Sequence, residues 1–374
     1  MTAASDRFHR TGGRGGPPDV NGHPARPCLW RALVWMLVAG VTVAACGTGG
    51  GSSSAPPADP EPTATADTAA AFPLTMEHKY GSTEIPDVPE RVVSVGLTDQ
   101  DPILALGVAP VGVLDWFGDQ PNAVWPWARD ELGDADPEII GVEGELNYEL
   151  IAGLRPDVII GVYSGLTEDE YDTLSQIAPT VAQPAEYADY AVPWQEQTRV
   201  IARALGRAEK AEQLITEVEG LFERAREAHP QFQGKTALVA TPADAGVYGT
   251  WGPTEPSGRF LTSLGFQLPP EIVELVGDGV QADFSREQFE LIDADVLIWL
   301  LNSPDEREAL ANDPLYQQLR VASQGRDIFL EYEPFGAAIF FSSPLSLPFL
   351  LEELVPQIAA AAGGDPATEV SPGS

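Results

Sequence analysis

Sulfur and histidine are scarce in this chain of 374 residues, which has two cysteines and four histidines. Cys28 lies inside the first 45 residues, and Cys46 follows them directly. Once that leading part is set aside, no cysteine pair remains for a disulfide and no thiolate for a nucleophile. Only His78 and His229 remain as imidazole ligands. We therefore expect no site for a bare transition metal.

Basic residues are also few, because 21 Lys and Arg stand against 56 Asp and Glu, a formal net charge of −35. Phosphate backbones are bound by clustered cations, so we exclude nucleic acid as a partner. The sequence also lacks a G-x-S-x-G elbow and a phosphate-binding loop. Acidic pairs arise by chance in so acidic a chain. We therefore do not expect an enzyme.

Long apolar runs are absent except for "ALVWMLVAGVTVAA", Ala32 to Ala45. At about 14 residues it is short for a membrane span and typical of a signal-peptide core. It ends in Val43-Ala44-Ala45-Cys46, which resembles a bacterial lipobox with Val in place of the usual Leu. The Cys46 thiol would then carry a lipid and become the mature N-terminus. The alternative is an ordinary signal peptide with a bystander cysteine.

Short β-branched runs alternate with helix-like stretches on both sides of a long helical segment. The first runs are "RVVSVG", "APVGVL", "PEIIGV" and "PDVIIGVY", and "KTALVAT" and "RDIFLEY" follow after the helix. Buried strands that alternate with helices are typical of parallel sheets. The segment from Trp194 to Pro230 is broken at Leu205-Gly206, and Arg207 to Ala228 predicts one long helix. A last helix is expected from about Pro344 to Ala360.

These patterns predict an α/β protein of two lobes with parallel sheets. The expected divisions are a signal peptide at 1–45, a tether at 46–75, an N-terminal lobe at 76–193, a helical segment at 194–230, a C-terminal lobe at 231–362 and a tail at 363–374.

One pattern occurs twice: "LNYELIAGLRPDVII", 146–160, returns 138 positions later as "FSREQFELIDADVLI", 284–298. In each copy a capping residue precedes a helix whose second residue is Glu149 or Glu287. A carboxylate there stabilises the helix by about 0.3 to 1 kcal/mol, which alone could explain both acids. The repeat also places the two acids at equivalent corners of two lobes, where they could bind two basic pockets on another protein.

Six ordered segments carry a resemblance to a known family. They run from "YGSTEIPDVPERVVSVGLTDQDPILALGVAPVGV" through "NYELIAGLRPDVII", "SGLTEDEYDTLSQIAPTV", "ARALGRAEKAEQLI" and "GRFLTSLGF" to "SSPLSLPFLLEELV". The chain from about Tyr80 to Val355 resembles the substrate-binding lipoproteins of ABC importers for ferric siderophores, haem and cobalamin. The resemblance implies two Rossmann-like lobes bridged by one long helix, with the ligand in the cleft between them.

The same resemblance implies partners and a location. Glu149 and Glu287 match the family's docking acids, which would form salt bridges with arginines of a dimeric permease that works with an ATPase. A lipid at Cys46 would hold the protein, as a monomer, on the outer face of the cytoplasmic membrane. A single bridging helix also predicts only modest closure of the lobes.

Ligands of open α/β sheets lie beyond the carboxyl ends of the strands. The residues that follow the apolar runs are rich in rings, which predicts a pocket for a large, partly apolar ligand. The candidate ligand-binding residues are Trp116, Tyr163, Ser164, Tyr248, Trp251, Arg259, Trp299 and Phe335. Two alternatives stay open, since Trp299 within its strand could belong to the core and Arg259 could be solvated or ion-paired.

The expected cargo is a ferric siderophore, with no covalently bound cofactor. Several siderophore binders place an arginine just before the first motif, whereas this chain has Glu143 and Glu145 there. These acids would repel an anionic tris-catecholate, so we favour a ferric hydroxamate. The alternatives are cobalamin, haem bound through a tyrosine such as Tyr163, or a surface lipoprotein that acts in sensing or envelope assembly without transport.

Overall fold

The computed structural model describes residues 72–364, which belong to one compact unit. The predicted signal peptide, Cys46, and most of the predicted tether and tail lie outside the described residues. The first described element is a hairpin of β1 (Leu74–His78) and β2 (Gly81–Ile85). It begins at Leu74, inside the range predicted as tether, because Met76 and Ile85 are buried in the core of the N-terminal lobe.

The N-terminal lobe is built on a six-stranded sheet in the order β6-β5-β4-β3-β7-β8. Neighbours are parallel except for the pair of β5 and β6. Strands β4, β5 and β6 follow one another on one side of β3, and β7 and β8 lie on its other side. The strand order therefore reverses between β3 and β7. The strands are β3 (Val92–Ser94), β4 (Gly112–Asp115), β5 (Glu138–Val142), β6 (Glu145–Leu146), β7 (Val158–Gly161) and β8 (Thr180–Ala182).

The C-terminal lobe is built on a five-stranded sheet in the order β11-β10-β9-β12-β13. Strands β9, β12 and β13 are parallel, whereas β10 and β11 run antiparallel to their neighbours. The strands are β9 (Ala237–Asp244), β10 (Val247–Trp251), β11 (Gln281–Ser285), β12 (Val296–Leu301) and β13 (Asp327–Glu331). Two lobes with mostly parallel sheets confirm the predicted fold class.

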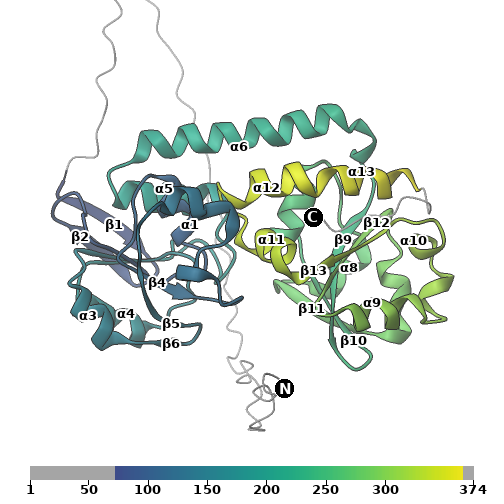
Figure 1. Ribbon diagram of the computed structural model, residues 1–374, viewed down its shortest axis with the longest axis horizontal. Helices are drawn as coiled ribbons and strands as arrows, with labels where there is room; N and C mark the ends of the chain where they lie inside the picture. The colour runs from purple at the N-terminus through teal and green to yellow at the C-terminus, as the bar shows by residue number, and fades with distance from the viewer. Residues whose placement is uncertain (1–71, 365–374) are drawn as a thin grey trace, which may run out of the picture. The chain divides into compact units, whose positions relative to one another are not determined.

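Helices cover both sheets (Figure 1). In the N-terminal lobe they are α1 (Gln100–Ala105), η1 (Pro121–Ala123), η2 (Pro126–Ala128), α2 (Arg129–Leu132), α3 (Tyr148–Leu154) and α4 (Glu168–Ser175). In the C-terminal lobe they are η3 (Pro230–Phe232), α7 (Pro256–Ser263), α8 (Pro270–Val276), η4 (Arg286–Ile292), α9 (Pro304–Ala311), η5 (Tyr316–Gln318), α10 (Arg320–Ser323), η6 (Tyr332–Gly336), α11 (Ala337–Phe341), α12 (Ser346–Glu353) and α13 (Val355–Gly363).

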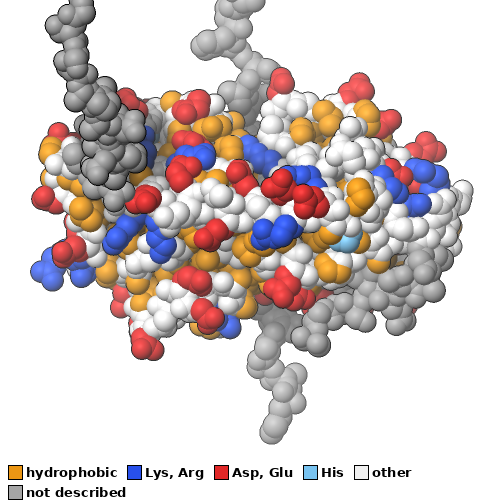
Figure 2. Space-filling view, turned by 90° about the horizontal axis from the view of Figure 1, so that it is seen from above, with side chains coloured by type: hydrophobic (Ala, Val, Ile, Leu, Met, Phe, Trp, Pro, Cys, Tyr) orange, Lys and Arg blue, Asp and Glu red, His pale blue; other side chains and the backbone are white. Residues whose placement is uncertain are grey.

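One long helix spans the two lobes. The helical segment divides into α5 (Trp194–Ala204) and α6 (Ala208–Ala228), with Gly206 at φ +66° in the break between them. Helix α6 packs on α5 at one end and on α12 and η3 towards the other (Figure 1). Its buried residues recur at helical spacing, at Ala211, Ile215, Val218 and Phe222. Figure 2 shows acidic and basic side chains intermixed over the face seen from above.

The repeated sequence motif has the same structural role in both lobes. Asp157, just before β7, accepts hydrogen bonds from the backbone N–H groups of Glu90 and Arg91, just before β3. Asp295, just before β12, accepts one from the N–H of Thr236, just before β9. Each aspartate therefore ties the start of one strand to the start of its neighbour. This equivalence supports the duplication inferred from the sequence.

A buried polar contact also joins the lobes. The Ser343 hydroxyl, before α12, donates to the Asp101 carboxylate in α1 at 2.6 Å, and the Trp127 indole N–H donates to the same oxygen at 2.8 Å. Burial raises the pKa of Asp101 to about 7. Its second oxygen has no hydrogen-bond partner among the described residues.

Candidate functional site

Aromatic side chains from the two lobes contact one another beyond the strand ends. The ring of Trp116, after β4, lies 5.8 Å from that of Phe341 in α11. Phe117 lies 5.7 Å from Tyr332 of η6, which stacks on Phe340 at 5.9 Å. We use the name interlobe site for these five rings and the polar groups beside them. Strands end at this place in both lobes, so the site forms only when the two sheets come together.

Two carboxylates belong to the interlobe site. Trp116 donates its indole N–H to Glu143 at 3.0 Å. Glu255 is 6% exposed and accepts from the backbone N–H and the hydroxyl of Ser257, while burial raises its pKa to about 7. Burial, and then the charges of Glu255 and Glu143, raise the pKa of Tyr332 to about 12. The aromatic surface therefore has a carboxyl group from each lobe, of which Glu255 is only partly ionised at pH 7.

Tyr163, after β7, connects this site to the loop before α5. Its hydroxyl donates to the carbonyl of Tyr190 at 3.0 Å, and the two rings lie 5.8 Å apart. Burial first, and then the charge of Glu255, raise the pKa of Tyr163. A cavity of about 10 Å³ between the lobes is lined by Tyr163, Val192, Trp194, Gln197, Pro256, Arg259, Phe341 and Ser342. Tyr163 therefore faces the C-terminal lobe.

Arg259 makes a contact across the lobes. It lies in the first turns of α7, which begins at Pro256. Its guanidinium donates to the carbonyl of Ala191 in the N-terminal lobe at 2.6 Å. Burial lowers the pKa of Arg259, while Tyr163 and Glu255 oppose that change. Glu255 thus offsets part of the only positive charge predicted for the site.

The other predicted ligand-binding residues lie in different surroundings. Trp251 joins the interlobe site, because its ring lies 4.9 Å from that of Phe340. The Ser164 hydroxyl donates to the carbonyl of Gly161 at 2.8 Å within its own turn. Phe335 is 5% exposed and packs in the core of the C-terminal lobe.

Trp299 and Tyr248 lie in a separate core of the C-terminal lobe. Trp299 is 0% exposed, which leaves it no surface for a ligand, and its indole N–H donates to the hydroxyl of Tyr316 at 2.9 Å. Tyr248 packs on Trp299, with the two rings 5.6 Å apart. Trp299 and Tyr248 therefore lie away from the interlobe site. Trp299 belongs to the core, which was the alternative left open for it by the sequence.

Six residues of the region are not among the eight predicted ligand-binding residues: Phe117, Tyr190, Glu255, Tyr332, Phe340 and Phe341. Tyr332 follows β13 directly, so the rule of strand ends could have found it. Glu255 lies in the loop that follows Trp251 and precedes α7, but nothing local in the sequence shows that its carboxylate is buried. Tyr190 lies in the loop before α5, and Phe340 and Phe341 lie in the five-residue helix α11; both segments are too short or irregular to be placed from periodicity.

The two acids of the repeated motif are exposed at the second position of α3 and η4. The Asn147 side chain accepts from the N–H of Leu150 at 3.0 Å, as a cap should. The second helix, η4, is a 3-10 helix with a kink at Gln288. The backbone N–H of Glu287 and the hydroxyl of Ser285 donate to the Glu287 carboxylate, and these hydrogen bonds lower the pKa of Glu287 below its usual value. Glu287 is therefore a charged group held at a helix start.

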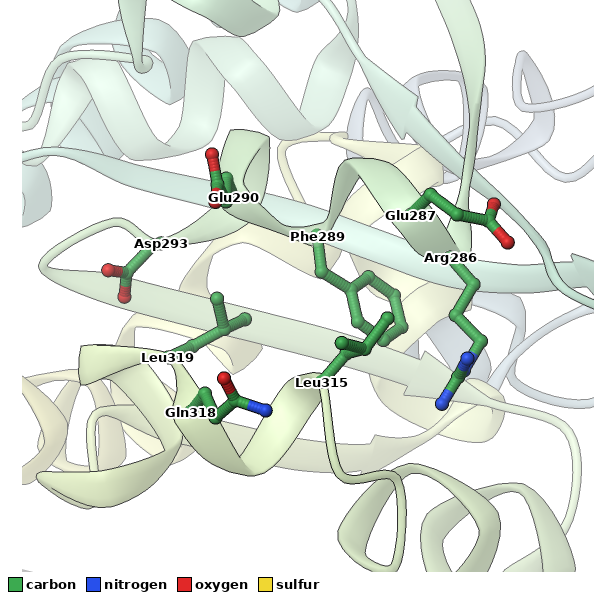
Figure 3. A pocket seen from close by; sticks show the side chains of 8 residues that line it. All are labelled: Arg286, Glu287, Phe289, Glu290, Asp293, Leu315, Gln318 and Leu319. Atoms are coloured by element: carbon green, nitrogen blue, oxygen red, sulfur yellow. The ribbon is translucent and has the colours of Figure 1, made fainter.

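A surface pocket of about 500 Å³ adjoins Glu287 (Figure 3). Its lining consists of Arg286, Glu287, Phe289, Glu290, Asp293, Leu315, Gln318 and Leu319. Arg286 forms an ion pair with Asp313, and its side chain diverges from that of Glu287 in Figure 3. The guanidinium of Arg286 is therefore paired with Asp313 and not with the Glu287 carboxylate.

Among residues 72–364, no three His, Asp or Glu side chains are grouped closely enough to hold a metal ion. His78 hydrogen-bonds to the hydroxyl of Thr83 at 3.0 Å and is buried. Within the same residues, no helix combines the length and the apolar character that crossing a bilayer requires.

Comparisons with known proteins agree with this geometry. Residues 92–332 match a family model described as periplasmic binding protein. A probable siderophore-binding lipoprotein of Bacillus subtilis, YfiY, is 32% identical over 268 residues, which cover 67% of this chain and 78% of that protein.

Two crystal structures resemble the fold closely. A periplasmic solute binding protein from Mycobacterium smegmatis is 39% identical with a TM-score of 0.70, covering 77% of this chain and 98% of that one. PiaA of Streptococcus pneumoniae in complex with ferrichrome is 27% identical with a TM-score of 0.68, covering 78% and 99%.

Proposed function

Because this chain belongs to the periplasmic binding protein family, we propose that it captures a ferric siderophore outside the cytoplasm and delivers it to an ABC permease. We further propose that it favours hydroxamate chelates. The observation that carries the proposal is the interlobe site, in which Trp116, Tyr332 and Phe340 meet two carboxylates. A binding role without catalysis is the role of this family.

The chemistry of the site supports this class of ligand. Rings from both lobes offer apolar surface for a large, partly apolar chelate. Glu143 repels a highly anionic ferric tris-catecholate, and the ionised fraction of Glu255 adds to this repulsion and offsets part of the charge of Arg259. A neutral ferric hydroxamate avoids this repulsion. In PiaA the crystallised ligand is ferrichrome, and YfiY is named as siderophore-binding.

A ligand panel tests the proposal. The purified protein is titrated with ferrichrome, a ferric tris-catecholate, haem and cobalamin, and the quenching of its tryptophan fluorescence is followed. Saturation by ferrichrome at micromolar concentration or below is the expected result. Saturation by haem or cobalamin alone would change the proposed cargo and leave the proposed importer role in place. No saturation by any of the four would favour a sensing or envelope role.

The charge of Glu143 should determine selectivity. The substitution Glu143→Arg removes a carboxylate beside Trp116 and adds a cation. The ratio of catecholate to hydroxamate affinity should therefore rise at least tenfold, which is a difference of about 1.4 kcal/mol in binding free energy. The matched control is Glu145→Arg, which changes the net charge equally at an exposed position in β6. Equal ratios in the two variants, measured by the same titration, would refute the assignment.

We also propose that Cys46 carries the lipid that anchors the protein, which agrees with the lipoprotein name of the YfiY relative. The variant Cys46→Ser should release most of the protein into the medium, because without the lipid only the apolar run Ala32 to Ala45 remains, which is short for a membrane span. Immunoblots of membrane and medium fractions measure this. Cys28→Ser, within the predicted signal peptide, is the control and should stay in the membrane fraction. Retention of Cys46→Ser there would contradict the anchor.

A further inference from the structure

The carboxylate of Asp99 is buried at the start of α1 and holds three groups. It accepts from the backbone N–H of Val162 at 2.7 Å and of Tyr163 at 3.1 Å. The side-chain amide of Gln197, in α5, donates to it at 2.7 Å. Asp99 is 0% exposed, and no ion pair involves it in the described part of the chain. A buried charge with only N–H donors around it is bound by hydrogen bonds alone.

Asp99 stands at a special place in the sheet. It follows β3, Tyr163 follows β7, and the strand order reverses between these two strands. Such a crevice is where open α/β sheets bind ligands. Gly96 makes room for the carboxylate, since a Cβ on Gly96 would lie 1.9 Å from an Asp99 oxygen.

The contacts of Asp99 continue into the interlobe site. Asp99 fixes the backbone of Tyr163, whose hydroxyl donates to the carbonyl of Tyr190. The next residue, Ala191, accepts from Arg259 of the other lobe. One carboxylate therefore supports a chain of contacts that ends in both walls of the site.

We propose that Asp99 is a positioning residue for ligand capture: its ionised carboxylate holds Tyr163, and through it the loop of Tyr190 and Ala191, in the geometry that binds the chelate. This inference rests on the proposed function. Asp99 itself does not contact the ligand, and its effect passes through Tyr163.

The charge state follows from the geometry. All the groups that contact the Asp99 carboxylate are donors, so a proton on it would oppose an N–H group and break a contact. Burial raises the pKa of Asp99 to about 6. The titratable neighbour is the Tyr163 hydroxyl, while Asp101, in the same helix, points to Trp127 and Ser343. Asp99 is therefore ionised at pH 7 and takes up a proton as the pH falls through about 6.

Affinity and stability should change in opposite directions over this range. If the ligand binds the ionised form, affinity falls by up to about tenfold for each pH unit below 6. The folded pKa of Asp99 is raised above its unfolded value, so this group stabilises the fold at low pH and loses that contribution as the pH rises through 6. Acid loss of affinity from Asp99 is thus not acid unfolding.

The test uses the purified full chain, ferrichrome and three proteins: wild type, Asp99→Asn and Asp157→Asn. Asp157 also accepts two backbone N–H bonds, but at the opposite end of β7, so it is the matched control. Tryptophan quenching gives the affinity from pH 5 to 8. Hydrogen exchange of the Val162 and Tyr163 amides at pH 7 is measured without ligand.

Wild-type affinity should fall below pH 6, and Asp99→Asn should bind about tenfold more weakly at pH 7, with a flatter pH profile and faster exchange at both amides. Asp157→Asn should keep the wild-type values. A flat wild-type profile, or unchanged amide exchange in Asp99→Asn, overturns the proposal. If ferrichrome binds none of the proteins, the proposed function loses its favoured ligand, and the amide exchange alone decides whether Asp99 positions Tyr163.

Discussion

Replacing Glu149 and Glu287 together with alanine should abolish ligand uptake by cells while the affinity for the ligand changes less than about twofold. Both carboxylates are exposed, one in each lobe, and neither belongs to the interlobe site. In the proposed docking mode each meets a permease arginine, and removing one partner of such a buried pair costs about 2 to 5 kcal/mol. Losing both therefore weakens docking by at least several hundredfold.

The measurement is uptake of an iron-labelled chelate in cells that express either variant. The control is Glu168→Ala with Glu308→Ala, which removes two exposed charges from α4 and α9. Normal uptake with the Glu149 and Glu287 variant would leave helix capping as the role of both acids. Weak ligand binding by that variant would instead show that the substitutions disturbed the fold.

Trp299→Ala should lower the free energy of unfolding by about 3 to 5 kcal/mol, because it empties a fully buried site in β12. The change also removes the hydrogen bond from the indole N–H to Tyr316, whose hydroxyl donates onward to Asp327 at 2.6 Å. Urea unfolding measures the loss as a lower midpoint. Ligand affinity should be unchanged where both proteins are folded.

The comparison for this prediction is Trp251→Ala, which deletes the same side chain at the interlobe site. Trp251 is only partly buried, so its loss should cost less stability and more affinity. If instead Trp299→Ala weakened binding in a folded protein, Trp299 would belong to the ligand site after all.

The architecture was accessible from the sequence because its signals are local. Leu205-Gly206 ends one helix, and the predicted helix from Arg207 to Ala228 is confirmed within one residue by α6. The predicted last helix was wrong in its continuity, since the chain forms α12 and α13 with a break at Leu354. Pro356 accounts for the break, because it lacks the N–H that a continuous helix would use.

The site was less accessible because the two faces of a sheet look alike in a sequence. Trp251 ends the partly buried strand β10 and Trp299 lies inside the fully buried strand β12; one reaches the interlobe site and the other a closed core. Strands buried on both faces lose the alternation that would tell them apart. Glu255 and Asp99 were missed for another reason: a buried carboxylate is recognised only by the donors that surround it.

Helix α6 is about 32 Å long and spans the two lobes as one rigid element. Together with the rings of Trp116 and Phe341 and the contact of Ser343 with Asp101, we expect it to keep the spacing of Glu149 and Glu287 nearly constant. In the proposed docking mode, the empty protein would then present the same two charges as the loaded one and would compete for the same permease. Uptake should therefore depend on the occupied fraction of the protein, and overproducing it at low chelate concentration should slow import.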